Sequence, residues 1–150
     1  EVGQDMSNAI GTMPAADGPT YDTFVSQYEE EYGNAAAAFT AQTYDASAVM
    51  LLANAAAGEN SGPAVRDQMQ NVANPGGTEV TIDNLAEGVE MAANGEEVQY
   101  AGASSAVNFD DEGDLQAGTY ELWEFDDSES GINRLNLVTV SRDQAIEPGS

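Results

Sequence analysis

The sequence contains no cysteine, no histidine and no lysine, and its three basic residues are all arginines. Without cysteine, the chain has neither a disulfide framework nor a thiol nucleophile. Without histidine and cysteine, it lacks zinc sites built on imidazole or thiolate and any Ser-His-Asp or Cys-His triad. The absence of lysine excludes a P-loop and a Schiff base. We therefore expect a protein that catalyses nothing and needs no cofactor.

Acidic residues dominate the charge: 27 acids against three arginines give a net charge of −24 over 150 residues. Such a chain is repelled by nucleic acid phosphates and by anionic lipids, so we expect no nucleic acid partner. The acids are spread along the whole chain, and molar salt screens their mutual repulsion. This pattern favours a protein from a high-salt environment, with an acidic interaction surface as the alternative. The 41% hydrophobic content is enough for a core within one domain or part of a larger one.

Apolar periodicity predicts four helices and several short strands. The helices are expected over residues 20–32, 36–57, 62–73 and 83–95, and the strands over 9–14, 79–82, 107–109, 119–125 and 132–140. Four amphipathic helices need a sheet to cover, yet most strand residues fall in one C-terminal hairpin. The helices therefore resemble the outer layer of an α/β domain whose parallel strands lie upstream. The loop 126–131 and the tail from Ser141 are expected to be irregular.

The acidic run from Asp110 to Asp114 is a candidate calcium loop, but its spacing differs from calcium-binding loops and a solvated turn is favoured. Adjacent acids such as Glu96-Glu97 and Asp126-Asp127 are common by chance in so acidic a chain. We therefore give no catalytic role to these pairs.

Aromatic residues recur at helical spacing, at Tyr21, Phe24, Tyr28 and Tyr32. They are interpreted as a stripe facing the core, with a ligand wall as the alternative. Trp123 is interpreted as packing in the core or between lobes. The dispersed residues Arg66, Arg134 and Arg142 are expected to pair with surrounding acids.

Four segments in order resemble the C-terminal part of a type I periplasmic-binding protein. They are AIGTMPA (9–15), FVSQYEEEYG (24–33), TYDASAVMLLANA (43–55) and YAGASSAVNFDDEGD (100–114), the last followed by YELWEF (120–125). The similar subgroup is the leucine-binding-protein-like solute-binding component of ABC transporters for branched-chain amino acids or amides. Haloarchaeal members of that subgroup share the acidic composition.

The resemblance implies a partial α/β fold from a two-lobed protein with a ligand cleft between hinged lobes. Residues 1–14 would be a crossover strand, 15–103 the helical part of the first lobe, and 104–140 the third crossover and the β-hairpin of the second lobe. Residues 141–150 would be a flexible tail. The central parallel sheet would be mostly missing from this chain.

By the same resemblance, Phe39, Ala41 and Gln42 would lie on the cleft wall, with core packing of Phe39 as the alternative. The hinge would include Met13, Pro14, Ser104 and Ser105. Ser105 stands where the family has glycine, and a positive φ at that position would strain the backbone. No metal site is expected.

The expected function is ligand capture for an ABC permease by an extracellular lipoprotein at the outer face of the cytoplasmic membrane. Its signal peptide and anchor would lie outside this chain. The ligand would be an amino acid or an amide. The alternative is a self-contained acidic structural or interaction domain of a halophile surface protein.

Overall fold

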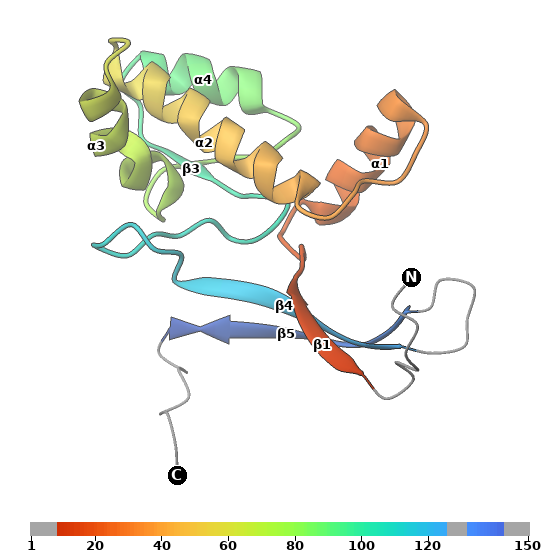
Figure 1. Cartoon of the computed structure of the whole chain (residues 1–150). Coiled ribbons are helices and arrows are strands. Elements are labelled where there is room, and N and C mark those ends of the chain that lie inside the picture. The colour runs from red at the N-terminus through yellow and green to blue at the C-terminus, as the bar shows by residue number, and fades with distance from the viewer. Residues whose placement is uncertain (1–8, 126–131, 143–150) are drawn as a thin grey trace.

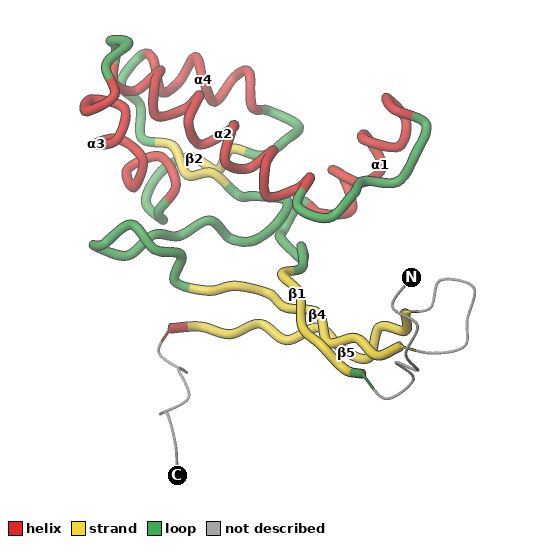
Figure 2. The backbone as a smooth tube through the Cα atoms, viewed as in Figure 1, coloured by secondary structure: helices red, strands yellow, loops and turns green. Residues whose placement is uncertain are grey.

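The computed structural model describes residues 9–125 and 132–142, which form two parts (Figure 1). The helical layer comprises four helices and a two-stranded parallel sheet, and the antiparallel sheet has three strands. The elements in chain order are β1 (Ile10–Pro14), α1 (Tyr21–Tyr32), α2 (Thr40–Ala57), α3 (Gly62–Ala73), β2 (Thr78–Val80), α4 (Leu85–Ala93), β3 (Val98–Tyr100), β4 (Ala117–Phe125) and β5 (Ile132–Ser141). The chain passes between the two parts through residues 15–20 and residues 101–116, drawn as green loops in Figure 2.

The antiparallel sheet has the strand order β1-β4-β5, so the expected C-terminal hairpin is confirmed and β1 extends it. A register shift between Leu122 and Trp123 interrupts the pairing of β4 with β5. Trp123 packs on β1, because a Cβ added at Gly11 would lie 2.4 Å from its ring. It also makes an edge contact with Phe125. Trp123 therefore contacts both β1 and Phe125 of its own strand.

The core of the helical layer lies between α2, α3 and α4 and the parallel pair β2–β3. Its most deeply buried large side chains are Val49, Leu52, Val80, Val98 and Tyr100. A smaller cluster centred on Phe24, Ala41 and Ala103 joins α1 to the N-terminal end of α2. The apolar faces predicted for these helices are therefore used in packing.

Other apolar side chains of the same elements are left uncovered. Met50 and Leu51 on α2 are 57% and 55% exposed, and Ile132 and Leu135 on β5 are 48% and 47% exposed. The parallel strands among the described residues are the two short strands β2 and β3. The expectation of a partial α/β fold whose central parallel sheet is mostly missing is thus confirmed.

The structure differs from the sequence-based expectations at several starts of elements. Helix α2 begins at Thr40 and not near residue 36, because Phe39 has a left-handed backbone with φ of 66°. Helix α4 is preceded by Asn84 and not capped by Asp83. Strand β3 (Val98–Tyr100) was not predicted.

The predicted C-terminal ends of the first two helices agree better with the structure, because Gly33 and Gly58 both adopt the left-handed conformation that ends a helix. The strand expected at 107–109 is reduced to a single bridge between Phe109 and Leu115. At the other end, β5 extends to Ser141. The expectations for the loop 126–131 and for residues 143–150 lie outside the described residues.

Candidate ligand-binding cleft

A cavity of about 240 Å³ lies between the helical layer and the antiparallel sheet. The helical side contributes all three residues that sequence analysis places on the cleft wall, Phe39, Ala41 and Gln42. The strand side contributes Met13 and Pro14, the last residues of β1. Segments that are far apart in the sequence therefore meet at one concave site.

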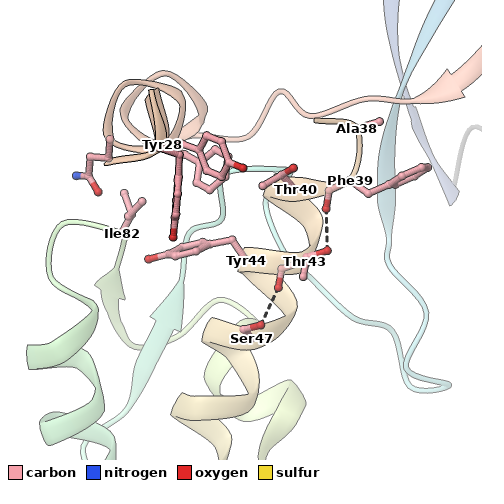
Figure 3. A pocket seen from close by; sticks show the side chains of 11 residues that line it. Tyr28, Ala38, Phe39, Thr40, Thr43, Tyr44, Ser47 and Ile82 are labelled. Carbon is pink, nitrogen blue, oxygen red and sulfur yellow. Dashed lines mark hydrogen bonds between the residues drawn. The ribbon is translucent and has the colours of Figure 1, made fainter. Parts of the chain in front are cut away.

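Phe39 is an exposed aromatic residue with a left-handed backbone, and it is not a core residue. It is 54% exposed, and its φ of 66° is unusual for a side chain of this size. The carbonyl oxygen of Phe39 accepts hydrogen bonds from the backbone N–H and the Oγ1 of Thr43, both at 2.9 Å. In Figure 3 its ring points away from Tyr28 and Tyr44. Strained backbone of this kind concentrates at binding and active sites.

Ala41 and Gln42 take different places in the cavity wall. Ala41 is 4% exposed and packs in the cluster with Phe24 and Ala103. The Nε2 of Gln42 donates a hydrogen bond of 3.3 Å to the carbonyl oxygen of Ala15. The Gln42 side chain thus connects α2 to the segment that follows β1, while Ala41 contributes a small apolar side chain to the cavity wall.

Two charged residues of the antiparallel sheet complete the cavity, and sequence analysis did not assign them to it. The Nε of Arg134 lies 2.5 Å from Oε2 of Glu121, whose whole residue is 9% exposed. Both residues line the cavity opposite the helical side. The register shift after Leu122 sets which side chains of β5 lie beside β4, and the sequence gives no sign of such a shift.

The expected hinge residues fall into two groups. Met13 and Pro14 line the cavity, whereas Ser104 and Ser105 lie in the connection between β3 and β4 and do not line it. The two connections run side by side, because the backbone N–H groups of Asp17 and Gly18 donate to the carbonyl oxygens of Ser104 and Ala103. Gly18 is required there, since a Cβ would lie 2.5 Å from the carbonyl oxygen of Gly102.

The strain anticipated at Ser105 is absent. Among the described residues, the positive-φ positions are glycines and Phe39, so Ser105 does not need the conformational freedom of glycine. Its Oγ is buried without a hydrogen-bond partner. Ser104, in contrast, donates both its backbone N–H and its Oγ to the carboxylate of Asp45.

A second cavity, of about 520 Å³, lies between α1 and α2 (Figure 3). Its aromatic lining includes Tyr28, Tyr32 and Tyr44. Phe24 is buried as the core interpretation requires, but Tyr32 is 63% exposed, so the aromatic stripe of α1 serves the core only at one end. Burial, and then Asp45 and Asp83, raise the pKa of the Tyr44 phenol, so it remains protonated in the neutral range.

The acidic run at 110–114 is a turn closed by an arginine. The Oδ1 of Asp110 accepts the backbone N–H groups of Glu112 and Asp114, and Arg142 pairs with the Oδ2 of Asp110. No group of acids in the part of the chain that the structure describes could hold a metal ion. The turn interpretation is confirmed, and Arg134 and Arg142 both pair with acids as expected; so does Arg66, with Asp67.

The sequence matches the family model "Receptor family ligand binding region" over residues 3–128, so the chain belongs to this family. Its fold is that of a leucine-binding-protein-like type I periplasmic-binding protein. The crystal structure of the leucine-binding protein LivK from Thermotoga maritima is similar, with a TM-score of 0.58 and 21% identity. The match covers 94% of this chain and 33% of LivK, so the chain spans about a third of that protein's length. No curated protein gives a significant match. None of the described helices is long and apolar enough to cross a membrane.

Proposed function

We propose that this chain is the C-terminal portion of a solute-binding protein that captures a branched-chain amino acid or a related amide for an ABC transporter. The ligand would occupy the cleft between two hinged lobes. The observation that carries the proposal is the cavity in which Phe39, Ala41 and Gln42 of the helical layer face Met13 and Pro14 of the antiparallel sheet. A cavity formed at the junction of two parts, with two connections beside it, suits closure around a ligand.

The chemistry of the lining favours an amino acid with an apolar side chain. The exposed ring of Phe39 offers apolar contact, and the amide oxygen of Gln42 offers a hydrogen-bond acceptor. LivK, a relative in fold, is a leucine-binding protein. In this proposal residues 15–103 belong to the first lobe, 104–140 to the third crossover and second lobe, and 1–14 to a crossover strand.

The proposed location is extracellular and rich in salt, and the proposed partner is a membrane permease. The net charge of −24 favours a halophilic protein, because the acidic groups repel one another at low salt. Molar salt reduces the Debye length to about 3 Å and so screens that repulsion. Membership of a family of receptor ligand-binding regions supports an extracellular location, and a lipid anchor and a membrane permease are proposed with it. No catalytic step is proposed, since the relatives in this family bind ligands.

The test is isothermal titration calorimetry in molar salt on the longest natural polypeptide that contains these residues. The titrants are L-leucine, L-isoleucine, L-valine, acetamide and urea. We expect saturable heat with at least one branched-chain amino acid. Heat with acetamide or urea alone would move the ligand class to amides. No heat with any titrant would contradict the proposal and favour the self-contained acidic interaction domain.

A further inference from the structure

The carboxylate of Asp45 is buried in the middle of the hydrogen bonds that join α2 to the connection between β3 and β4. Asp45 is 3% exposed, although aspartates are seldom buried. Its Oδ1 accepts from the Tyr100 hydroxyl at 2.8 Å and the Ala103 N–H at 2.9 Å. Its Oδ2 accepts from the N–H and Oγ of Ser104 at 2.7 and 2.5 Å. These four donors compensate the cost of burying the charge.

Position 45 requires a side chain in which both terminal atoms accept hydrogen bonds. Every group that faces the two carboxylate oxygens is a donor, so the NH₂ of an asparagine would meet an N–H or O–H. A Cβ at Gly102 would lie 2.6 Å from Oδ2, which shows how closely the backbone approaches the carboxylate. The Tyr100 phenol stays protonated as a donor, because burial and the charge of Asp45 raise its pKa. The site is built for a side chain that accepts hydrogen bonds through two oxygens.

The same carboxylate connects both passages between the helical layer and the antiparallel sheet. Asp45 lies on the first turns of α2, close after the cleft residues 39–42. The backbone that it holds, residues 102–104, accepts hydrogen bonds from the N–H groups of Asp17, Gly18 and Thr20 in the other connection. The start of α2 and both connections are thereby held in one unit.

We propose that Asp45 is a positioning residue that fixes residues 101–104 to α2. The antiparallel sheet then turns relative to the helical layer at one place in each connection, from Ser105 onward in one and next to Pro14 in the other. Ser104 then belongs to the fixed side of the hinge. Ser105, the first residue past the fixed segment, has a buried Oγ without a hydrogen-bond partner, so its side chain does not add to the bonds that hold residues 102–104. This inference rests on the proposed function, because it assigns a role to Asp45 in the closure of that cleft.

The absence of cysteine makes a direct test simple. Exposed Asn54 on α2 and Asn136 on β5 are each changed to Cys and spin-labelled, and electron paramagnetic resonance measures the distribution of distances between them. The variants are Asp45→Asn, Ser104→Ala and Tyr100→Phe. Ser104→Ala and Tyr100→Phe are a matched pair, because each removes one hydroxyl bond to the same carboxylate. Asp22→Asn on the exposed side of α1 controls for the change of charge.

We expect Tyr100→Phe and Asp22→Asn to keep the distance distribution of the parent chain, and Asp45→Asn and Ser104→Ala to give a broader one. In Asp45→Asn, the Ala103 and Ser104 amides should exchange hydrogen about 10- to 100-fold faster, since a hydrogen bond to a charged group is lost. If Asp45→Asn does not fold, Ser104→Ala and Tyr100→Phe decide the question. Equal distributions for these two variants would overturn the proposal. The readout needs no ligand, so its outcome is independent of whether leucine binds.

Discussion

At the scale of the single residue, a substitution at Phe39 should change the affinity for the cleft ligand without lowering the free energy of unfolding. Its φ of 66° costs an L-residue about 1–2 kcal/mol, and glycine adopts this conformation freely. In Phe39→Gly we expect an unchanged or slightly higher free energy of unfolding. The affinity for the cleft ligand should fall about tenfold or more, because the ring no longer buries apolar surface.

Chemical denaturation and calorimetry on the same preparations measure the two effects. The control is Phe24→Ala, which truncates a ring that is 4% exposed in the core. That change should cost about 3–5 kcal/mol of stability. A large loss of stability in Phe39→Gly would assign Phe39 to the core after all.

Tyr100 makes stability sensitive to high pH. Burial first, and then Asp45, raise its pKa above the ordinary value of 10.0, so the folded state keeps the phenol proton more tightly than the unfolded state. This contribution is fully present below pH 10 and is lost as the pH rises through the folded-state pKa. The free energy of unfolding should therefore fall above pH 10 in the parent and fall less steeply in Tyr100→Phe. Parallel pH curves for the two proteins would show that the buried phenol is not responsible.

At the scale of the element, glycine controls how closely α4 approaches β2. A Cβ at Gly88 would lie 2.4 Å from Cγ1 of Val80, whereas a Cβ at Gly62, at the start of α3, would meet nothing within 4 Å. Gly88→Ala should lower the free energy of unfolding by about 1–3 kcal/mol through overpacking. Gly62→Ala should raise it by about 0.4–1 kcal/mol. Thermal unfolding of both variants checks the contrast, and equal effects would mean that α4 does not pack on Val80 as described.

Element ends were easier to predict from sequence than element starts. Gly33 and Gly58 end their helices because few other residues adopt the left-handed conformation cheaply. Thr20 and Ser61 precede their helices as predicted, but neither side chain makes a capping hydrogen bond. The predicted start of α2 was wrong by several residues. The left-handed backbone at Phe39 overrides the helix propensity of the alanine run before it.

The site was predictable in part, for similar reasons. The family resemblance placed Phe39, Ala41 and Gln42 on one wall, and all three line the same cavity. Glu121 and Arg134 were missed because their meeting depends on strand register. Asp45 was missed because a lone aspartate on a helix gives no sign that four donors from β3 and the following segment converge on it.

At the scale of the whole molecule, charge sets the conditions for stability. A net charge of −24 repels itself in dilute buffer, and the Debye length falls from about 10 Å at 0.1 M salt to about 3 Å at 1 M. We expect the urea midpoint to rise steadily from 0.1 M to molar sodium chloride. Potassium chloride at the same ionic strength should act equally, since screening does not depend on a bound ion. A midpoint that is flat with salt would contradict a halophilic adaptation.

The central claim is that residues from both parts of this chain enclose an amino acid. Hydrogen-exchange mass spectrometry with and without L-leucine, in molar salt, tests it on the longest natural polypeptide that contains the chain. We predict that leucine slows exchange in two segments of the cavity wall together, residues 13–16 and 39–42. No protection, or protection confined to the tyrosine-lined cavity between α1 and α2, would contradict the account.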